Sequence, residues 1–174
     1  MHYCGINKED VMNGPGIRLS LFVSGCTNHC KGCFSPETWN FDYGNEYTDD
    51  TENMIIRELS KPYYDGITIL GGEPFEPENQ IELIKLIRRI RKDLPDKTIW
   101  MFSGNVYEDL SDKEYKKHTD VTDEIFNSID VLVDGSFDIE RRDISLAFRG
   151  SANQRIIDIK ETRKTGVIKA LQFD

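Results

Sequence analysis

The stretch from Ile17 to Cys33 reads IRLSLFVSGCTNHCKGC and joins a strand pattern directly to a cluster of cysteines. Its first half alternates in the way a half-buried strand does: Ile17, Leu19, Leu21 and Val23 occupy one face, and Arg18, Ser20, Phe22 and Ser24 the other. Gly25 predicts the end of the strand. The segment therefore predicts a strand whose carboxyl end leads straight into a cysteine-rich loop, Gly25–Phe34.

The same order of strand and glycine loop recurs along the chain. Three further expected strands run into short loops: Ile67–Leu70 into Gly71-Gly72-Glu73-Pro74, Thr98–Phe102 into Ser103-Gly104, and Asp130–Val133 into Asp134-Gly135. Helical patterns separate these strands, at Thr51–Leu59, Glu78–Leu94, Glu108–Lys117 and Asp123–Ser128. Strands alternating with helices indicate an α/β fold with a mainly parallel sheet. Ligands of such sheets bind at the carboxyl ends of the strands, so we expect the four loops to meet on one rim.

Composition narrows the class of protein. A length of 174 residues predicts a single domain, 1–174, and 38% hydrophobic with 30% charged residues is typical of a globular chain. The formal charge of −9 argues against direct binding of nucleic acid, which depends on Lys and Arg. No apolar run approaches the roughly 20 residues of a membrane span, and the N-terminus has no secretory pattern. We therefore expect a cytoplasmic protein without membrane contact.

The charge is unevenly distributed. Acidic residues gather in 46–52 and 109–124, whereas the C-terminal part is locally basic, with Arg141, Arg142, Arg149, Arg155, Lys160, Arg163, Lys164 and Lys169. These groups are either solvated faces of the fold or a surface that docks a partner or contacts an anion.

The cysteines Cys26, Cys30 and Cys33 are spaced C-x3-C-x2-C, and the chain has four cysteines in all. In a chain without an export signal such clustering indicates metal binding or catalysis rather than disulfides. Structural zinc would need a fourth ligand such as Cys4 or His29, and an electron-transfer cluster would need four cysteines. A third hypothesis is a [4Fe–4S] cluster held by three thiolates, which leaves one iron open for a substrate.

The C-x3-C-x2-C spacing resembles the signature of the radical S-adenosylmethionine superfamily. The resemblance implies that Cys26, Cys30 and Cys33 hold the cluster and that the methionyl amine and carboxylate of S-adenosylmethionine chelate the open iron. The family usually has an aromatic residue where this chain has Gly32. Gly32 and Phe34 are therefore the expected adenine-side contacts, and Cys33 is also expected to contact the cofactor.

Two further motifs resemble landmarks of that superfamily. Gly71-Gly72-Glu73-Pro74 is similar to its glycine-rich turn, in which close backbone approach and the Glu73 carboxylate are expected to meet the methionyl end. The segment Trp100–Gly104 resembles the strand and turn that help to seat S-adenosylmethionine. Ser103 keeps the hydroxyl that the family more often places on a threonine.

Three more segments resemble the activating proteins of anaerobic (class III) ribonucleoside-triphosphate reductases: Asn13–Arg18, Val133–Phe137 and Arg149–Asp158. Asn13 departs from the family's usual Asp. This resemblance implies a shortened, open (β/α) partial barrel with no catalytic residue beyond the cluster. It also implies cleavage of S-adenosylmethionine to a 5′-deoxyadenosyl radical, which generates a glycyl radical on the large subunit of the reductase. A flavodoxin-type protein is the expected electron donor, and the basic C-terminal region is expected to contact the reductase at the open side.

Other functions fit the same motifs. The chain could activate another glycyl-radical enzyme or modify a small molecule by radical S-adenosylmethionine chemistry. Outside the enzymes, it could be a small iron–sulfur or zinc binding module.

Overall fold

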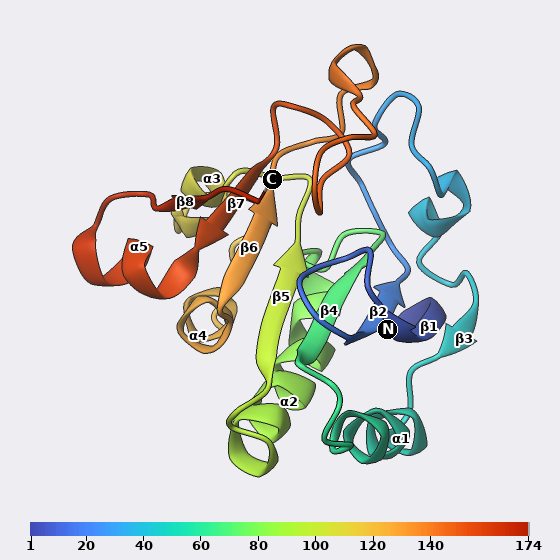
Figure 1. The fold of residues 1–174 in the computed structure, drawn as a ribbon. Helices are drawn as coiled ribbons and strands as arrows, with labels where there is room; N and C mark the ends of the chain where they lie inside the picture. The colour runs from blue at the N-terminus through green and yellow to red at the C-terminus, as the bar shows by residue number, and fades with distance from the viewer. Residues whose placement is uncertain (174) are drawn as a thin grey trace.

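The computed structural model describes residues 1–173, which form one sheet with helices packed mainly on one side (Figure 1). In this part of the chain the sheet has eight strands in the order β3-β1-β2-β4-β5-β6-β7-β8. Their bounds are β1 His2–Asp10, β2 Arg18–Val23, β3 Asn45–Glu46, β4 Gly66–Gly71, β5 Thr98–Phe102, β6 Val131–Asp134, β7 Arg155–Asp158 and β8 Ala170–Leu171. The four central strands β2, β4, β5 and β6 are parallel to one another, and antiparallel strands extend the sheet at both ends.

Four of the five helices in residues 1–173 connect the parallel strands, and the last one connects the antiparallel strands β7 and β8. The helices are α1 Asp49–Leu59, α2 Pro77–Asp93, α3 Tyr107–Ser111, α4 Thr122–Ser128 and α5 Ile159–Thr165, with 3-10 turns η1 Pro36–Trp39 and η2 Ile139–Arg141. Figure 1 shows α2 behind the sheet, while the loop between β1 and β2 crosses in front of it. None of the helices in residues 1–173 is long and apolar enough to cross a membrane.

Strand alternation divides the core between the two faces of the sheet. Along β5, Ile99 and Met101 join the large cluster beneath α1, α2 and α4, whereas Trp100 belongs to a smaller cluster with Val131 and Val133 of β6. This is the period of two that a pleated strand imposes. The helical face is thus closed by apolar packing, and the other face is left for loops.

A buried arginine fastens the loop that crosses this second face. Arg18 is fully buried and donates to the Thr68 hydroxyl at 2.7 Å and the Thr98 hydroxyl at 2.9 Å, while Thr68 donates to the Asn13 carbonyl at 2.8 Å. Burial lowers the pKa of Arg18 to about 10, still well above neutral, so the guanidinium stays charged. Asp10 caps the same loop by accepting from the backbone N–H of Met12. The loop that contains residues 11–13 is therefore held against the face of the sheet on which Thr68 lies.

The strand predictions for the parallel core are confirmed within a residue or two, and so is the long helix α2. The predicted helix Glu108–Lys117 is wrong beyond Ser111: α3 ends there, and the Asp112 carboxylate accepts from the backbone N–H of Glu114. Such a local side-chain bond competes with helical pairing. Residues 112–121 form a loop instead, and this loop carries Lys117 into the interior.

Helix α2 buries one apolar face and leaves one isoleucine outside it. Leu83, Ile84, Ile87 and Ile90 are buried in the core, but Ile81 is 55% exposed. It lies on the flank of the helix, outside the stripe that faces the sheet.

This difference gives a matched test of the core. Ile87→Ala removes a fully buried side chain and is expected to lower the free energy of unfolding by about 2–5 kcal/mol, because a cavity remains. Ile81→Ala on the same helix should change it by less than about 0.5 kcal/mol. Urea unfolding of both apoproteins measures the contrast, and similar losses in the two variants would contradict the assigned face of α2.

Candidate functional site

A cavity of about 720 Å³ lies at the carboxyl ends of the parallel strands. All four expected loops contribute to it: Cys26–Trp39 after β2, Leu70–Gly72 after β4, Phe102–Gly104 after β5, and Gly135 with Phe137 after β6. The prediction that these loops meet on one rim is confirmed. Two further walls come from Val11–Asn13 and from the segment Arg142–Gly150. The volume falls in the range of roughly 300–1,000 Å³ that is usual for small-molecule sites.

The three clustered cysteines share one side of this cavity. Cys26, Cys30 and Cys33 all line it, and a turn closed by the Cys33 N–H on the Cys30 carbonyl at 3.1 Å brings the last two together. Burial raises the pKa of the Cys26 thiol to about 11 and also raises that of Cys30. Binding of a cation by these thiolates would therefore release protons.

The donors in the cavity fit a cluster with an open position better than a closed zinc site. Cys4 lies on β1 and is not among the residues that line the cavity. The His29 ring stacks on Trp39, with centroids 4.5 Å apart, and does not line the cavity either. Among residues 1–173, no three His, Cys, Asp or Glu side chains, the three cysteines included, converge on a site for a single metal ion. The cavity thus offers three thiols and neither of the fourth ligands that zinc would need.

The backbone of the cysteine loop requires glycine at the end of β4, at Gly71, and at the next position, Gly72. Gly71 has a φ of +110°, and a Cβ there would lie 2.6 Å from the Val23 carbonyl oxygen. A Cβ on Gly72 would lie 2.6 Å from the Gly25 carbonyl oxygen. Without side chains, the turn pairs with the end of β2: the Gly72 N–H donates to Val23 at 2.7 Å and the Glu73 N–H to Gly25 at 2.8 Å. Gly71 and Gly72 therefore line the cavity and also fix the start of the cysteine loop against β4.

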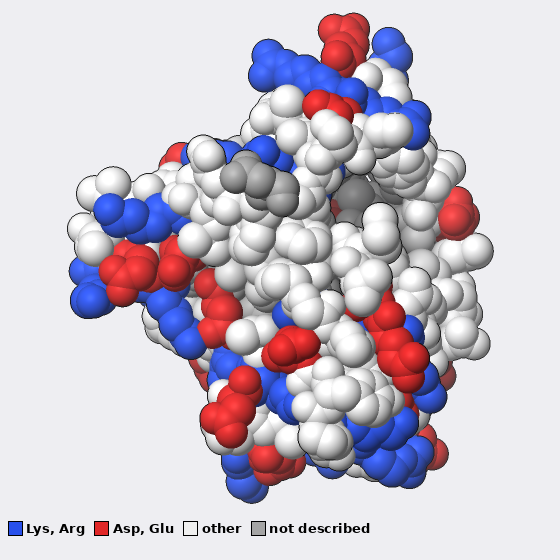
Figure 2. Space-filling model, in the orientation of Figure 1, with Lys and Arg blue, Asp and Glu red and all other residues white. Residues whose placement is uncertain are grey.

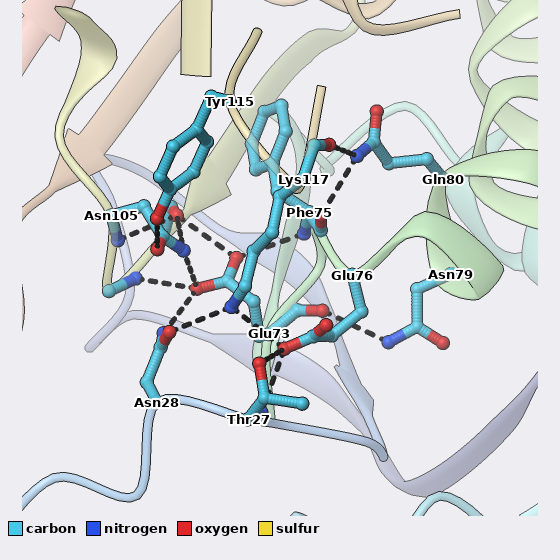
Figure 3. A network of polar contacts seen from close by, with 12 residues as sticks. Thr27, Asn28, Glu73, Phe75, Glu76, Asn79, Gln80, Asn105, Tyr115 and Lys117 are labelled. Carbon is cyan, nitrogen blue, oxygen red and sulfur yellow. Dashed lines mark hydrogen bonds and ion pairs between the residues drawn. The ribbon is translucent and has the colours of Figure 1, made fainter. Parts of the chain in front are cut away.

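Glu73 lies behind this turn and not in the cavity wall. Its side chain is fully buried, and its carboxylate accepts hydrogen bonds of 2.7–3.0 Å from the side chains of Asn28, Ser103 and Asn105 and the backbone N–H groups of Phe75 and Gly104 (Figure 3). Burial raises the pKa of the Glu73 carboxyl, although Lys117 and the donors oppose the shift. The glycine-rich motif predicts this carboxylate against a ligand, but in the structure it accepts hydrogen bonds from the chain's own loops.

A second acid and a lysine complete this network, and the sequence analysis did not find them. Glu76 accepts from both the N–H and the hydroxyl of Thr27 at 2.7 Å, and from Lys117 at 2.8 Å. Burial alone would raise the pKa of Glu76, but the bonds from Lys117 and Thr27 hold it below its usual value. The only sequence signal was the spacing of Glu76, three residues after Glu73 in the same turn. Nothing in the sequence around Lys117 marks it as buried.

Of the two residues expected on the adenine side, only Phe34 lines the cavity. Phe34 lines the cavity, is 67% exposed, and packs on Phe137 with centroids 5.0 Å apart, while the Arg142 guanidinium lies 5.3 Å from the Phe34 ring centre. Gly32 has a φ of +75° and faces Ile139, and it is not among the lining residues. Ser103 does line the cavity, but its hydroxyl donates to Glu73 at 3.0 Å.

The mouth of the cavity is unusually apolar for a surface. Val11, Met12 and Ile144 are 58%, 75% and 89% exposed, and all three line the cavity. Figure 2 shows the same pattern: the middle of this face, where Figure 1 draws the loop before β2, is largely without charged side chains. Clustered exposed apolar side chains are typical of an interaction surface.

The basic C-terminal region is largely neutralised by its own fold. Arg155 pairs with Asp134 and Glu108, and the other ion pairs are Lys160–Asp130, Arg163–Asp123 and Lys164–Glu161. Arg141 and Arg142 differ, because they stand beside the apolar mouth; Arg141 contacts only Asp138, at 3.4 Å, among the ion pairs of the described residues. Arg149 and Lys169 also take part in no ion pair among the described residues, but Arg141 and Arg142 are the two exposed neighbours at the mouth.

Comparison with known protein families defines the class. Residues 12–157 match the family described as a 4Fe-4S single cluster domain, and the chain belongs to this family. The matched range includes the three cysteines and every loop after a parallel strand.

Individual relatives define the family more narrowly. The chain is 39% identical over 158 residues to a Vibrio cholerae protein and 40% identical over 158 residues to one from Haemophilus influenzae, in both cases over 90% of this chain and 97% of the relative. It is 35% identical over 156 residues to a protein of Enterobacteria phage T4, covering 90% of this chain and 93% of the relative. All three are named anaerobic ribonucleoside-triphosphate reductase-activating protein. The chain belongs to this family of reductase-activating proteins, as its motifs predicted.

The Glu73 network can be tested in the apoprotein. In Glu73→Gln, burial of a neutral amide is cheaper, but one oxygen becomes an NH2 group among hydrogen-bond donors. Whichever way the amide turns, the backbone N–H of Phe75 or of Gly104 loses its acceptor. We expect the loss to prevail and the free energy of unfolding to fall by about 1–3 kcal/mol.

Urea unfolding measures this change. Glu82→Gln is the control, because Glu82 pairs with Lys85 on the surface of α2, where loss of the pair should cost less than about 1 kcal/mol. A Glu73→Gln protein as stable as the wild type would show that the buried carboxylate does not hold the loops together.

Proposed function

We propose that the chain is a radical S-adenosylmethionine activase that generates a glycyl radical on an anaerobic ribonucleoside-triphosphate reductase. The observation that carries this proposal is the cavity that brings Cys26, Cys30 and Cys33 together with the Gly71–Gly72 turn and Ser103. The names of the relatives support the reductase as the target. They favour it over another glycyl-radical enzyme or a small-molecule substrate.

In this proposal the three thiolates hold a [4Fe–4S] cluster whose remaining iron binds the methionyl end of S-adenosylmethionine. When bound and reduced, the cluster supplies the electron that cleaves the sulfonium to methionine and a 5′-deoxyadenosyl radical, which then takes a hydrogen atom from a glycine Cα of the reductase. The chain contributes position and electrostatics, as is usual where a cofactor carries the difficult chemistry. No general acid or base is needed.

The cavity walls suggest how the cofactor would lie. Gly71 and Gly72 present backbone close to the thiols, and Ser103 closes the same side, so we assign this end to the methionyl group. The exposed Phe34 ring, flanked by Phe137 and Arg142, is a flat surface suited to stacking of adenine. Glu73 and Gly32 take supporting positions behind these contacts.

The fold and the surroundings extend the proposal. We infer that the four parallel strands, open at the side where β1 and β7 run antiparallel, form a shortened, open (β/α) partial barrel. The open mouth would admit the glycine loop of the reductase beside Val11, Met12 and Ile144. A cytoplasmic setting and a flavodoxin-type electron donor complete this proposal, because cleavage of a sulfonium requires a cluster near the reducing limit of roughly −700 mV.

The proposed chemistry has a direct test. The protein is reconstituted anaerobically with iron and sulfide, reduced, and assayed for 5′-deoxyadenosine after addition of S-adenosylmethionine. We expect product from the wild type and none from Cys26→Ala, Cys30→Ala or Cys33→Ala, because two thiolates do not hold the cluster. Cys4→Ala is the matched control and should retain product, since Cys4 lies on β1 outside the cavity wall. A wild-type protein that binds a cluster but never forms 5′-deoxyadenosine would overturn the proposal.

The docking surface is tested separately by binding. Arg141→Glu combined with Arg142→Glu reverses the two charges at the mouth, and we expect the Kd for the reductase to rise about tenfold or more, with a weaker dependence on salt. Lys164→Glu, an exposed change on α5, is the control and should leave the Kd within about twofold. Equal Kd values for the wild type, the double variant and the control would show that Arg141 and Arg142 do not contribute to binding of the reductase.

A further inference from the structure

The loop between α3 and α4 places a lysine ammonium beneath the cysteine loop. Lys117 is only 2% exposed, and its Nζ donates to the Asn28 side-chain carbonyl at 2.7 Å and to Glu76 at 2.8 Å (Figure 3). Asn28 and Lys117 are 89 positions apart in the sequence. A lysine is rarely buried to this extent unless it is paired, so its placement calls for an explanation beyond packing.

Asn28 stands midway between Cys26 and Cys30, and both ends of its side chain are used. Its amide NH2 donates to Glu73 at 2.7 Å, while its oxygen accepts from Lys117. The preceding residue, Thr27, is held by Glu76 through its N–H and its hydroxyl. The segment between the first two thiols is therefore fastened from below by two carboxylates and one ammonium.

Lys117 is itself held in place by polar contacts of its own loop with α2. Its backbone carbonyl accepts from the Gln80 side chain at 2.7 Å, and the oxygen of that side chain accepts from the hydroxyls of Thr119 and Thr122. Gln80 is fully buried on α2, so the loop around Lys117 is anchored to the long helix. The ammonium thus reaches the cysteine loop from a rigid support.

Neither Lys117 nor Glu76 lines the cavity, whereas Asn28 does. We infer that Lys117 is a positioning residue: through Asn28 and Glu76 it fixes the Cys26–Cys30 segment so that the thiols face the cavity. The inference rests on the proposed cluster site for its purpose. What the inference states is that Lys117 orders the cysteine loop in the apoprotein, and the apoprotein is therefore used for the test.

The test measures alkylation of individual cysteines in the folded apoprotein by iodoacetamide, followed by mass spectrometry. In Lys117→Met we expect Cys26, which is 8% exposed in the wild type, to react at least about tenfold faster. Burial raises the pKa of the Cys26 thiol and the Lys117 ammonium opposes this shift, so loss of the charge alone would slow the reaction. An acceleration therefore reports release of the loop, and an unchanged rate would overturn the inference.

Lys97→Met is the matched control for a general loss of stability. Lys97 donates to the carbonyls of Lys61 and Tyr64 at 3.0 and 2.6 Å, at the opposite end of the sheet from the cysteines. We compare the two variants at denaturant concentrations that give equal stability. Faster reaction of Cys26 only in Lys117→Met supports the inference, and equal acceleration in both reduces Lys117 to a stabilising residue.

A double variant separates two effects of removing Lys117: the loss of the hydrogen bond that positions Asn28, and the unpaired charge left on Glu76. It also provides a test if Lys117→Met alone does not fold. Glu76→Gln with Lys117→Met removes the carboxylate that would be left buried without its cation, so we expect stability to return. The Asn28 oxygen still lacks its donor, so Cys26 should stay at least about fivefold more reactive than in Glu76→Gln alone. If the double variant regained stability and its Cys26 reacted no faster than in Glu76→Gln, the positioning role of Lys117 would be contradicted.

A spectroscopic readout connects the loop to the cluster. In the reconstituted and reduced protein, we expect Lys117→Met to change the electron paramagnetic resonance spectrum of the cluster, while Lys97→Met keeps the wild-type spectrum. Identical spectra for all three would overturn the role toward the cluster. Because the alkylation test uses no cofactor, a protein that orders its loop through Lys117 but forms no 5′-deoxyadenosine would refute the proposed function and not this inference.

Discussion

The buried carboxylate of Glu73 is the interaction on which the site depends. It accepts hydrogen bonds from groups that follow three different strands: Asn28 after β2, Phe75 within its own turn after β4, and Ser103, Gly104 and Asn105 after β5. Parallel strands bring these loops to one edge of the sheet but do not pair them with one another. An ionised acceptor can satisfy several donors at once, and bonds to a charged group are the stronger kind. One acid therefore joins loops that would otherwise meet only around a cavity.

This arrangement explains why glycine precedes the acid. The carboxylate can reach its donors only if the turn lies directly against the end of β2, where a side chain at position 71 or 72 would collide with the Val23 or Gly25 backbone. The glycines and the acid are thus parts of one constraint. The closeness of the turn to the thiols, which suits contact with a ligand, follows from the same packing.

The sequence predicted the parts of the site that follow from periodicity and from spacing along the chain. Strand alternation located β2, β4, β5 and β6, and the C-x3-C-x2-C spacing identified the three thiols that share the cavity. It could not predict the direction of the Glu73 side chain, because a carboxylate in a glycine turn is equally suited to a ligand and to neighbouring N–H groups. Lys117 was missed because its surroundings are polar and helix-like, and only the Asx turn at Asp112 shows that the chain leaves the helix there. The antiparallel strands β1 and β7 were missed for a related reason, since they are short or lack a clear alternation and depend on their neighbours for order.

The ionisable groups buried beneath the cysteine loop are the last feature that the fold must accommodate. Glu73 and Glu76 bring two carboxyl groups into the interior and Lys117 brings one ammonium. Burial raises the pKa of Glu73, whereas the bonds from Lys117 and Thr27 hold the pKa of Glu76 below its usual value. Three thiolates would add further negative charge at the cavity wall, and like charges in a poorly solvated region repel one another. The ammonium lies on the side of the loop away from the cavity, where it offsets this repulsion without occupying space that a ligand needs. A neutral residue of the same length would fill the volume but leave the loop between Cys26 and Cys30 bordered by acids alone. The buried ammonium of Lys117 therefore both holds Asn28 and Glu76 in place and supplies the one positive charge of this network.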